Sequence, residues 1–349
     1  MSASEVPPLQ HAIRHLAMGG SLSEGESRAA FGAVMSGEGT PAQLAALLVG
    51  LRVKGETADE VAGAADALRG AMVHLDADRP NDLVDTCGTG GGAVPTFNIS
   101  TAAALLAAGL GVRVAKHGNR SFTSQCGSAD VLEALGVPID VGADVMARAL
   151  RDAGIVFMFA PLMHPAMRHV GPVRRELAIP TVMNIVGPLA NPASAGRQVV
   201  GVADARRVPL IAGALRTLGT IHALVVHGEP GMDEISPLGP THVVEIRDGR
   251  SEDWTIDPAR YGFGAGRADE MRGGPPAENA AAVLAVMENR APATAAAAVV
   301  LNAAGALYVA PGGPTDFGDA VSAARAGLQN GVGMQALERL RKAYRVGSS

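Results

Sequence analysis

A cluster of glycines between an apolar run and an alanine-rich run constrains this chain more than any other feature. Residues 83–87 are mostly apolar, residues 88–92 include four glycines, and residues 99–110 are rich in alanine and leucine. This order indicates a strand, a loop and a helix. Because glycine has no Cβ, the loop backbone can adopt positive φ and bring its N–H groups close to an anion such as phosphate. We expect Ser100 or Thr101 to cap the helix.

A polar segment follows a second predicted strand. Residues 112–115 are apolar apart from one arginine, and residues 116–120 then supply a lysine, a histidine, an asparagine and an arginine. Ligands of open α/β sheets bind at the carboxyl ends of the strands, so both polar segments are expected to meet one anionic ligand there. The glycine loop lacks the Gly-Lys-Ser/Thr ending of a P-loop. A lysine also stands where a dinucleotide-binding fold would place its acid.

The first part of the chain, residues 8–73, predicts four helices. Three capping boxes begin the later ones, and these are Ser23 with Glu26, Thr40 with Gln43, and Thr57 with Glu60. Gly37 and Gly55 stand where C-terminal caps belong. The third helix carries an apolar stripe at helical spacing, formed by Leu44, Leu47, Leu48 and Leu51. Two interpretations remain open for this stripe, which are packing within the bundle and a subunit interface.

From residue 83 onward, predicted strands alternate with predicted helices. Strands are expected at 155–159, 198–202 and 222–226, and helices at 128–135, 143–153 and 206–218. The alternation predicts an α/β fold, in which a small N-terminal helical domain precedes a larger domain whose mainly parallel central sheet is flanked by helices.

The C-terminal part carries two further signals. Asp248-Gly249 between residues 241–247 and 253–256 predicts a hairpin, which we expect to form an antiparallel appendage. Residues 278–346 return to helix. Within them, residues 293–310 are mainly alanine with Asn302 midway, so they are too weakly hydrophobic to span a membrane and predict a buried helix.

Composition limits the possible partners and compartments. A net charge of −5 and a pI near 6.0 argue against a nucleic-acid-binding surface. Cys87 and Cys126 are too few for a disulfide framework or a zinc site, and we expect both to be buried thiols in a reducing compartment. Residues 1–14 contain no apolar segment typical of a secretory signal. We therefore expect a cytoplasmic protein that contacts neither membrane nor nucleic acid.

Several sequence blocks together resemble the anthranilate phosphoribosyltransferase family. They are residues 88–91, 96–101, 116–120, 127–133, 164–167, 172–177, 184–192 and 231–236. The resemblance extends over nearly the whole chain. It implies transfer of the 5-phosphoribosyl group from phosphoribosyl pyrophosphate (PRPP) to the amine of anthranilate, a step of tryptophan biosynthesis that releases pyrophosphate.

The resemblance also implies a division of the chain into two domains. The helical domain would comprise residues 1–76 with about 165–192, and the α/β domain residues 80–164 with about 193–349. The site would lie in the cleft between them. Prolines at 165, 172, 180 and 188 divide the connecting segment into short helices and turns. A homodimer formed through the N-terminal helices is expected as well.

Metal and substrate residues follow from the same resemblance. Asp233, Glu234 and Ser100 would bind magnesium, with two Mg²⁺ ions per site, and neighbouring carboxylates suit this hard cation. The residues assigned to PRPP are Gly88, Gly91, Gly92, Thr96, Asn98, Ile99, Ser100, Thr101, Lys116, His117, Gly118, Asn119, Arg120, Ser121, Phe122, Thr123, Ser124 and Ser128.

The site for the acceptor, anthranilate, needs a group that binds its carboxylate more than it needs a general base. The amine of anthranilate is already neutral at pH 7, whereas its carboxylate suits the planar fork of an arginine. The resemblance assigns anthranilate to Arg174, Asn119, His117, His164 and Gly88.

Two other functions remain open. A pyrimidine nucleoside phosphorylase would share the architecture but use phosphate and lack the paired acids at 233 and 234. A non-catalytic relative that binds nucleic acid would be expected to carry a basic charge balance, which this chain does not.

The glycine loop departs from the family pattern at one place. Most family members have an acid and then a glycine where this chain has Gly92 and Ala93. Gly92 can still donate its backbone N–H, and Asp233 and Glu234 still supply negative charge for a metal. We therefore expect an active enzyme.

Overall fold

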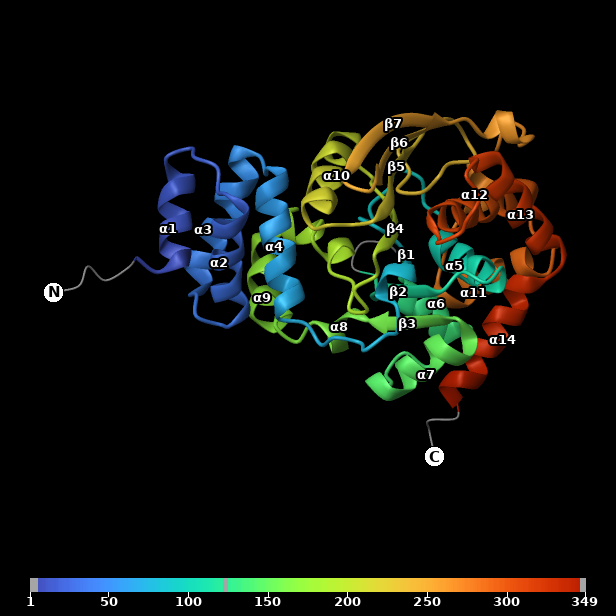
Figure 1. Ribbon diagram of the computed structural model, residues 1–349, viewed down its shortest axis with the longest axis horizontal. Coiled ribbons are helices and arrows are strands. Elements are labelled where there is room, and N and C mark those ends of the chain that lie inside the picture. Colours follow the sequence, from blue (N-terminus) through green and yellow to red (C-terminus); the bar gives the residue numbers. More distant parts are fainter. Residues whose placement is uncertain (1–5, 122–124, 346–349) are drawn as a thin grey trace.

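The protein is arranged as a helical bundle beside a central sheet, with a second group of helices on the far face of the sheet (Figure 1). The computed structural model describes residues 6–121 and 125–345. The described part contains no helix that is both long enough and apolar enough to cross a membrane.

The sheet has seven strands in the order β3-β2-β1-β4-β5-β6-β7. Their bounds are β1 Val84–Gly88, β2 Val114–Gly118, β3 Ile155–Phe159, β4 Arg197–Gly201, β5 His222–Gly228, β6 Thr241–Arg247 and β7 Arg250–Ile256. The first five strands in chain order are parallel, whereas β6 and β7 run antiparallel.

The Asp248-Gly249 turn forms as predicted, but the prediction that the hairpin is a separate appendage was wrong. Asp248 and Gly249 both have positive φ, 50° and 77°, as a two-residue turn between twisted strands requires. The strands that they join are not an appendage, because β6 pairs along its whole length with β5 and extends the central sheet.

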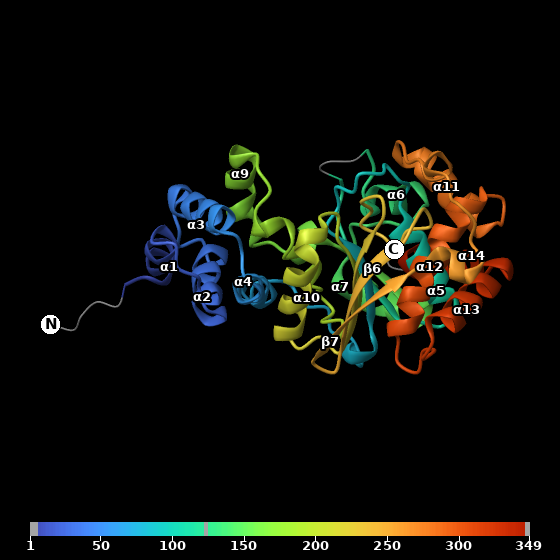
Figure 2. The same ribbon diagram turned by 90° about the horizontal axis from the view of Figure 1, so that it is seen from above.

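Strand order reverses between β1 and β4. The connection after β1 runs through helix α5 (Ile99–Gly109) and the connection after β4 runs through α10 (Val208–Thr217). These helices cover opposite faces, since α10 packs against α4 while α5 packs against α12 and α14 (Figure 2). Loops that leave adjacent strands toward opposite faces open a crevice at the carboxyl edge of the sheet, where α/β proteins bind their ligands.

Further helices bury the face covered by α5. They are α6 (Ser128–Ala134), α7 (Ala143–Ala153), α11 (Pro276–Met287), α12 (Ala293–Val309), α13 (Phe317–Gln329) and α14 (Val332–Arg345). Helix α12 is buried along most of its length, as its composition predicts. Of the two cysteines, Cys126 is buried and Cys87 is only partly buried.

The N-terminal helices α1 (Pro8–Ala17), α2 (Glu24–Met35), α3 (Pro41–Lys54) and α4 (Ala58–Gly70) form the bundle. All three predicted capping boxes are present. The leucine stripe of α3 is between 0% and 3% exposed and lies in the core of the bundle. The interpretation of this stripe as a subunit interface was therefore wrong, because neighbouring helices of the same chain already cover it.

The proline-rich segment joins the bundle to the sheet. It contains α8 (Ala160–Met163), α9 (Met167–Leu177) and two 3₁₀ turns, η2 (Val182–Asn184) and η3 (Gly187–Leu189). Helix α9 packs against α2 and α3. One hydrophobic core contains apolar residues of the bundle, of this segment and of the sheet face near α10.

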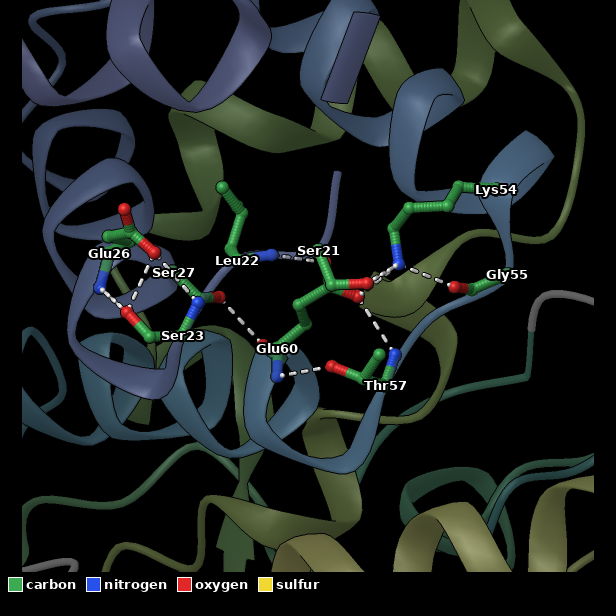
Figure 3. Close-up of polar contacts among 9 residues, drawn as sticks. All are labelled: Ser21, Leu22, Ser23, Glu26, Ser27, Lys54, Gly55, Thr57 and Glu60. Carbon is green, nitrogen blue, oxygen red and sulfur yellow. Dashed lines mark hydrogen bonds and ion pairs between the residues drawn. The ribbon is translucent and has the colours of Figure 1, made fainter. Parts of the chain in front are cut away.

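The buried carboxylate of Glu60 connects several segments of the helical bundle through hydrogen bonds (Figure 3). Glu60 is 0% exposed, and its Oε1 accepts from the Leu22 N–H at 2.8 Å. Its Oε2 accepts from the Thr57 N–H at 2.8 Å and from Lys54 Nζ at 2.9 Å. Glu60 thus caps α4, neutralises the last lysine of α3 and holds the loop before α2.

Comparing two capping-box glutamates tests this network. Glu60→Gln leaves the Lys54 charge without its buried partner, so we expect a loss of about 3–5 kcal/mol in the free energy of unfolding, measured with urea. Glu26→Gln is the matched control, because Glu26 closes the box of α2 but is partly exposed. That variant should lose less than about 1 kcal/mol. Equal losses in the two variants would contradict a special role for Glu60.

Candidate active site

An acidic segment, residues 231–235, lies across the ends of β1 and β4. Gly88 and Gly201 are paired at these strand ends. A Cβ on Gly201 would lie 1.7 Å from the Asp233 carbonyl oxygen, and a Cβ on Gly88 would lie 3.0 Å from Asp233 Oδ2. Glycine at both strand ends is therefore what allows the acidic segment to approach so closely. Sequence reasoning missed Gly201, because nothing in its local pattern shows which segment it contacts.

The glycine loop is folded back onto the same segment. Gly90 and Gly91 have positive φ of 70° and 79°. The Gly90 N–H donates to Asp233 Oδ2 at 2.8 Å, and the Ala93 N–H donates to the Gly231 carbonyl at 2.8 Å. A Cβ on Gly92 would lie 2.9 Å from Asp233 Oδ1. The position where this chain lacks the expected acid thus faces Asp233 directly.

Glu234 faces the start of α5. Helix α5 begins at Ile99 with Asn98 as its N-cap, and the Asn98 side chain makes no capping hydrogen bond. The prediction that Ser100 or Thr101 caps the helix was therefore wrong, since both lie within its first turn. The Ser100 N–H donates instead to Glu234 Oε1 at 3.2 Å, so the carboxylate satisfies one of the free N–H groups of the helix.

Lys116 lies beneath this contact. It is 3% exposed, and its Nζ donates to the Thr86 carbonyl at 2.5 Å and to Ser100 Oγ at 3.2 Å. Burial lowers the pKa of Lys116, while the carboxylates of Asp85 and Glu234 act in the opposite direction. The lysine therefore supplies positive charge below the site and keeps the Ser100 hydroxyl in place.

Burial raises the pKa of both acids. Loss of water contact, and then the charge of Asp233, raises the pKa of Glu234 to about 8. Loss of water contact is also the main cause that raises the pKa of Asp233. Two neighbouring carboxylates at this edge can both ionise more easily when a cation lies beside them.

This donor set fits magnesium. Within residues 6–121 and 125–345, no three His, Cys, Asp or Glu side chains gather as a metal site. Mg²⁺ is commonly held by one or two carboxylates, with substrate phosphates and water as the other ligands. Asp233 and Glu234, with the Ser100 hydroxyl beside them, match that pattern, and the adjacent glycine loop could receive the phosphates.

A buried pair fixes β1 against β2 below the site. Asp85 is 0% exposed and accepts from the His117 N–H at 3.2 Å and from Asn191 Nδ2 at 2.7 Å. Asn191 Nδ2 also donates to the Ala115 carbonyl at 2.8 Å. Burial raises the pKa of Asp85 to about 6, although Lys116 and the hydrogen bonds oppose the shift. The only sequence signal for Asp85 was an acid inside an apolar strand.

Two histidines connect β2 to the proline-rich segment. The Nε2 atoms of His117 and His164 lie 3.1 Å apart, so one ring donates a hydrogen bond to the other. Burial, with His164 as the next cause, lowers the pKa of His117 to about 3. Burial lowers the pKa of His164 to about 4. Both rings are therefore neutral at pH 7. The structure brings together two residues that the family resemblance assigns to the acceptor.

The segment after β2 closes on itself. Gly118 packs against Ser128, whose Oγ donates to the Asn119 carbonyl at 3.3 Å. Arg120 forms ion pairs with Asp130 at 2.7 Å and Glu133 at 2.6 Å. The Ser121 N–H donates to Asp130 Oδ2 at 3.3 Å. The Arg120 guanidinium is thus paired with acids of α6, while Phe122, Thr123 and Ser124 lie outside the described residues.

The segment before α5 is held by α11. Asn98 Oδ1 accepts from Asn279 Nδ2 at 2.8 Å, and Asn98 Nδ2 donates to the Cys126 carbonyl at 3.2 Å. Thr96 forms a bridge with Arg272, and Ile99 is buried in the core. Among the described residues, the buried Thr101 Oγ1 has no hydrogen-bond partner. Asn98 is thereby fixed beside the two loops that the sequence assigns to phosphate.

Arg174 lies on α9, away from the sheet. Its side chain is partly buried, and burial lowers its pKa. Within the described part of the chain, the guanidinium forms no ion pair or hydrogen bond. A partly buried guanidinium without an acid is available to a carboxylate ligand.

Comparisons with known proteins agree with this arrangement. The family model for the glycosyl transferase family, a/b domain, matches residues 80–334, and the model for the helical bundle domain of the same family matches residues 10–72. The anthranilate phosphoribosyltransferase of Chloroflexus aggregans (strain MD-66 / DSM 9485) is 48% identical over 320 residues, which cover 91% of this chain and 93% of that protein.

Solved structures are similar over almost the whole chain. The crystal structure of anthranilate phosphoribosyltransferase from Thermus thermophilus has a TM-score of 0.90 and 40% identity, covering 96% of this chain and 99% of that one. The enzyme from Saccharomyces cerevisiae in complex with PRPP and Mg has a TM-score of 0.86 and 26% identity, with 97% and 98% covered.

Proposed function

The chain belongs to the anthranilate phosphoribosyltransferase family, and we propose on this premise how its residues perform the reaction. It transfers the 5-phosphoribosyl group of PRPP to the amine of anthranilate, giving N-(5-phosphoribosyl)anthranilate and pyrophosphate for tryptophan biosynthesis. The observation that carries the proposal is the contact between the glycine loop and the Asp233–Glu234 pair at the carboxyl edge of the sheet.

Asp233, Glu234 and Ser100 would hold magnesium. Mg²⁺ held by these residues would supply positive charge that stabilises the pyrophosphate leaving group. Asp233 faces the glycine loop and Glu234 faces the N-terminus of α5, so each acid lies beside a different phosphate-binding segment. This arrangement supports two ions rather than one. The paired acids also make a pyrimidine nucleoside phosphorylase or a nucleic-acid-binding relative the less favoured alternative.

The chain's own residues would bind PRPP in two groups. Backbone N–H groups of residues 88–92 and of the first turn of α5 would receive phosphate oxygens. Asn98, Thr101, Lys116 and Ser128 would supply side-chain donors. Asn98 is already fixed by Asn279, which favours one orientation of its amide.

Anthranilate would bind between Arg174 and the histidine pair. The guanidinium would take the carboxylate, while Asn119 and Gly88 would lie beside the amine. His117 and His164 are neutral and would contact the ring without adding charge. A neutral aryl amine needs no strong base, which agrees with a pocket whose imidazoles bind few protons at pH 7.

The assembly proposal concerns the N-terminal helices. Met18 at the end of α1 is 88% exposed and Val53 on α3 is 81% exposed, and these helices pack together. Exposed apolar side chains on one bundle support a homodimer formed there.

We further propose that the chain divides into two domains, residues 1–76 with about 165–192 and residues 80–164 with about 193–349. The cleft between these domains would close on the substrates. We also propose a cytoplasmic location for this biosynthetic step.

The reaction itself is the first test. Purified protein with PRPP, anthranilate and Mg²⁺ should consume anthranilate, followed by the loss of its fluorescence. Asp233→Asn with Glu234→Gln removes the metal-binding charge at constant volume, so kcat should fall to less than about a tenth, equivalent to more than about 1.4 kcal/mol. A folded double variant that keeps a higher kcat would contradict the metal assignment.

Arg174→Ala tests the acceptor clamp. A charged hydrogen bond contributes about 1.5–3 kcal/mol, so KM for anthranilate should rise by about ten- to over a hundredfold. KM for PRPP should change little. The neighbouring exposed Arg175 gives the matched control, and Arg175→Ala should leave both constants near those of the wild type. An equal rise of both constants in Arg174→Ala would make Arg174 a structural residue.

Gly92→Asp tests the departure in the glycine loop. The new carboxylate would stand beside Asp233, so it should alter KM for PRPP or the magnesium dependence, by less than about tenfold because the metal ligands are intact. KM for anthranilate should stay nearly unchanged. The control Ala93→Asp places the same charge at the neighbouring position. A wild-type protein without transferase activity that Gly92→Asp restores would refute the proposed function.

A further inference from the structure

Asn302 is a buried amide in the middle of helix α12. It is 3% exposed and stands in a run composed mainly of alanine and valine. Asparagine is a poor residue for a helix interior, and a buried amide is costly unless it is hydrogen-bonded. Neither the packing of the core nor the stability of the helix explains its presence, so its hydrogen-bond partners indicate its role.

The Asn302 amide pairs with both backbone groups of Ile235, the residue that follows the two acids. The Ile235 N–H donates to Asn302 Oδ1 at 2.9 Å, and Asn302 Nδ2 donates to the Ile235 carbonyl at 2.9 Å. Nδ2 also donates to the Ala298 carbonyl, one turn earlier in α12, at 2.9 Å. The amide therefore acts toward Ile235 as a neighbouring strand would, and the helix fixes its orientation.

Close packing leaves this contact little freedom. A Cβ on Gly305, one turn after Asn302, would lie 2.9 Å from Ile235 Cδ1. Asn302, Glu234 and Ser100 also line one cavity of about 10 Å³, which is barely enough for one water molecule. Helix α12 thus reaches the acidic segment directly beside the Glu234 carboxylate and the first turn of α5.

We infer that Asn302 is a positioning residue for the metal-binding acids. By pairing with the Ile235 peptide, it holds the backbone of Asp233 and Glu234 so that one acid faces the glycine loop and the other faces α5. The inference rests on the proposed metal site and adds a residue that touches neither metal nor substrate. Removing groups that orient metal ligands typically weakens metal binding by about 10- to 100-fold.

Direct titration of the metal tests the inference without depending on turnover. Mn²⁺ is added to the purified protein in the absence of pyrophosphate, which would itself bind the metal, and free Mn²⁺ is followed by electron paramagnetic resonance. Asn302→Ala introduces a strong helix former, and Asn302→Leu keeps the branching at Cγ with apolar groups, but neither can pair with Ile235. Both variants should raise the dissociation constant for Mn²⁺ by at least about tenfold. In turnover, the Mg²⁺ requirement should rise while KM for anthranilate stays unchanged.

Two reference variants separate the possible causes. Leu150→Ala removes a buried side chain of α7, which packs against β3 and α14 on another part of the sheet. It should lower Tm and leave the Mn²⁺ dissociation constant within about twofold. Asp233→Asn with Glu234→Gln should abolish the specific binding.

Each remaining outcome would overturn the inference. Asn302 variants that bind Mn²⁺ within about threefold of the wild type, while the double acid variant does not bind it, would refute the role of Asn302 alone. Equal weakening by Leu150→Ala would make the effect one of general stability. Failure of both Asn302 variants to fold would make Asn302 a residue of the fold. Unchanged binding by the double acid variant would refute the proposed metal site, and this inference with it.

Discussion

Placing two carboxylates side by side at the ends of β1 and β4 is the constraint on which the site depends. Asp233 and Glu234 are adjacent in sequence, and loss of water contact raises the pKa of both. Such a pair persists only where other groups offset its charge. The Gly90 N–H, the Ser100 N–H and the Lys116 ammonium do so in this chain. The same donors surround the region where a phosphorylated ligand and its cation would bind.

Each supporting group belongs to a different element, which explains why the architecture is needed. Lys116 comes from β2, Ser100 from α5 and the glycine loop from β1, and the sheet brings these three segments to one edge. Asp85 and Asn191 then connect that edge to the proline-rich segment. Because this segment packs on the N-terminal helices through α9, one continuous set of contacts joins the proposed metal site to the proposed acceptor site.

Local signals in the sequence predicted the features that depend on neighbouring residues. Capping boxes such as Thr57 with Glu60, the glycine loop and the Asp248-Gly249 turn are fixed by hydrogen bonds and φ angles within a few residues. The family resemblance supplied the fold class and the reaction, and the comparisons confirm both. The roles assigned to individual site residues stay predictions.

The structural features that the sequence did not predict depend on contacts between segments that are far apart in the chain. The Ser100 N–H donates to Glu234, and a capping rule that considers only neighbouring residues does not predict this bond. The hairpin extends the central sheet because β6 pairs with the free edge of β5. The leucine stripe of α3 packs against neighbouring helices of the same chain and not against a second subunit. Gly201 allows close approach of Asp233, and Asn302 forms hydrogen bonds with Ile235. Both contacts join residues that are far apart in the sequence, so no local pattern predicts them.

Anomalous diffraction from a crystal grown with Mn²⁺ and PRPP tests the central claim most directly. The account predicts Mn²⁺ bound to carboxylate oxygens of Asp233 and Glu234 and to pyrophosphate oxygens that the glycine loop binds. Manganese that contacts the pyrophosphate but neither carboxylate, or PRPP bound away from residues 88–92, would contradict it.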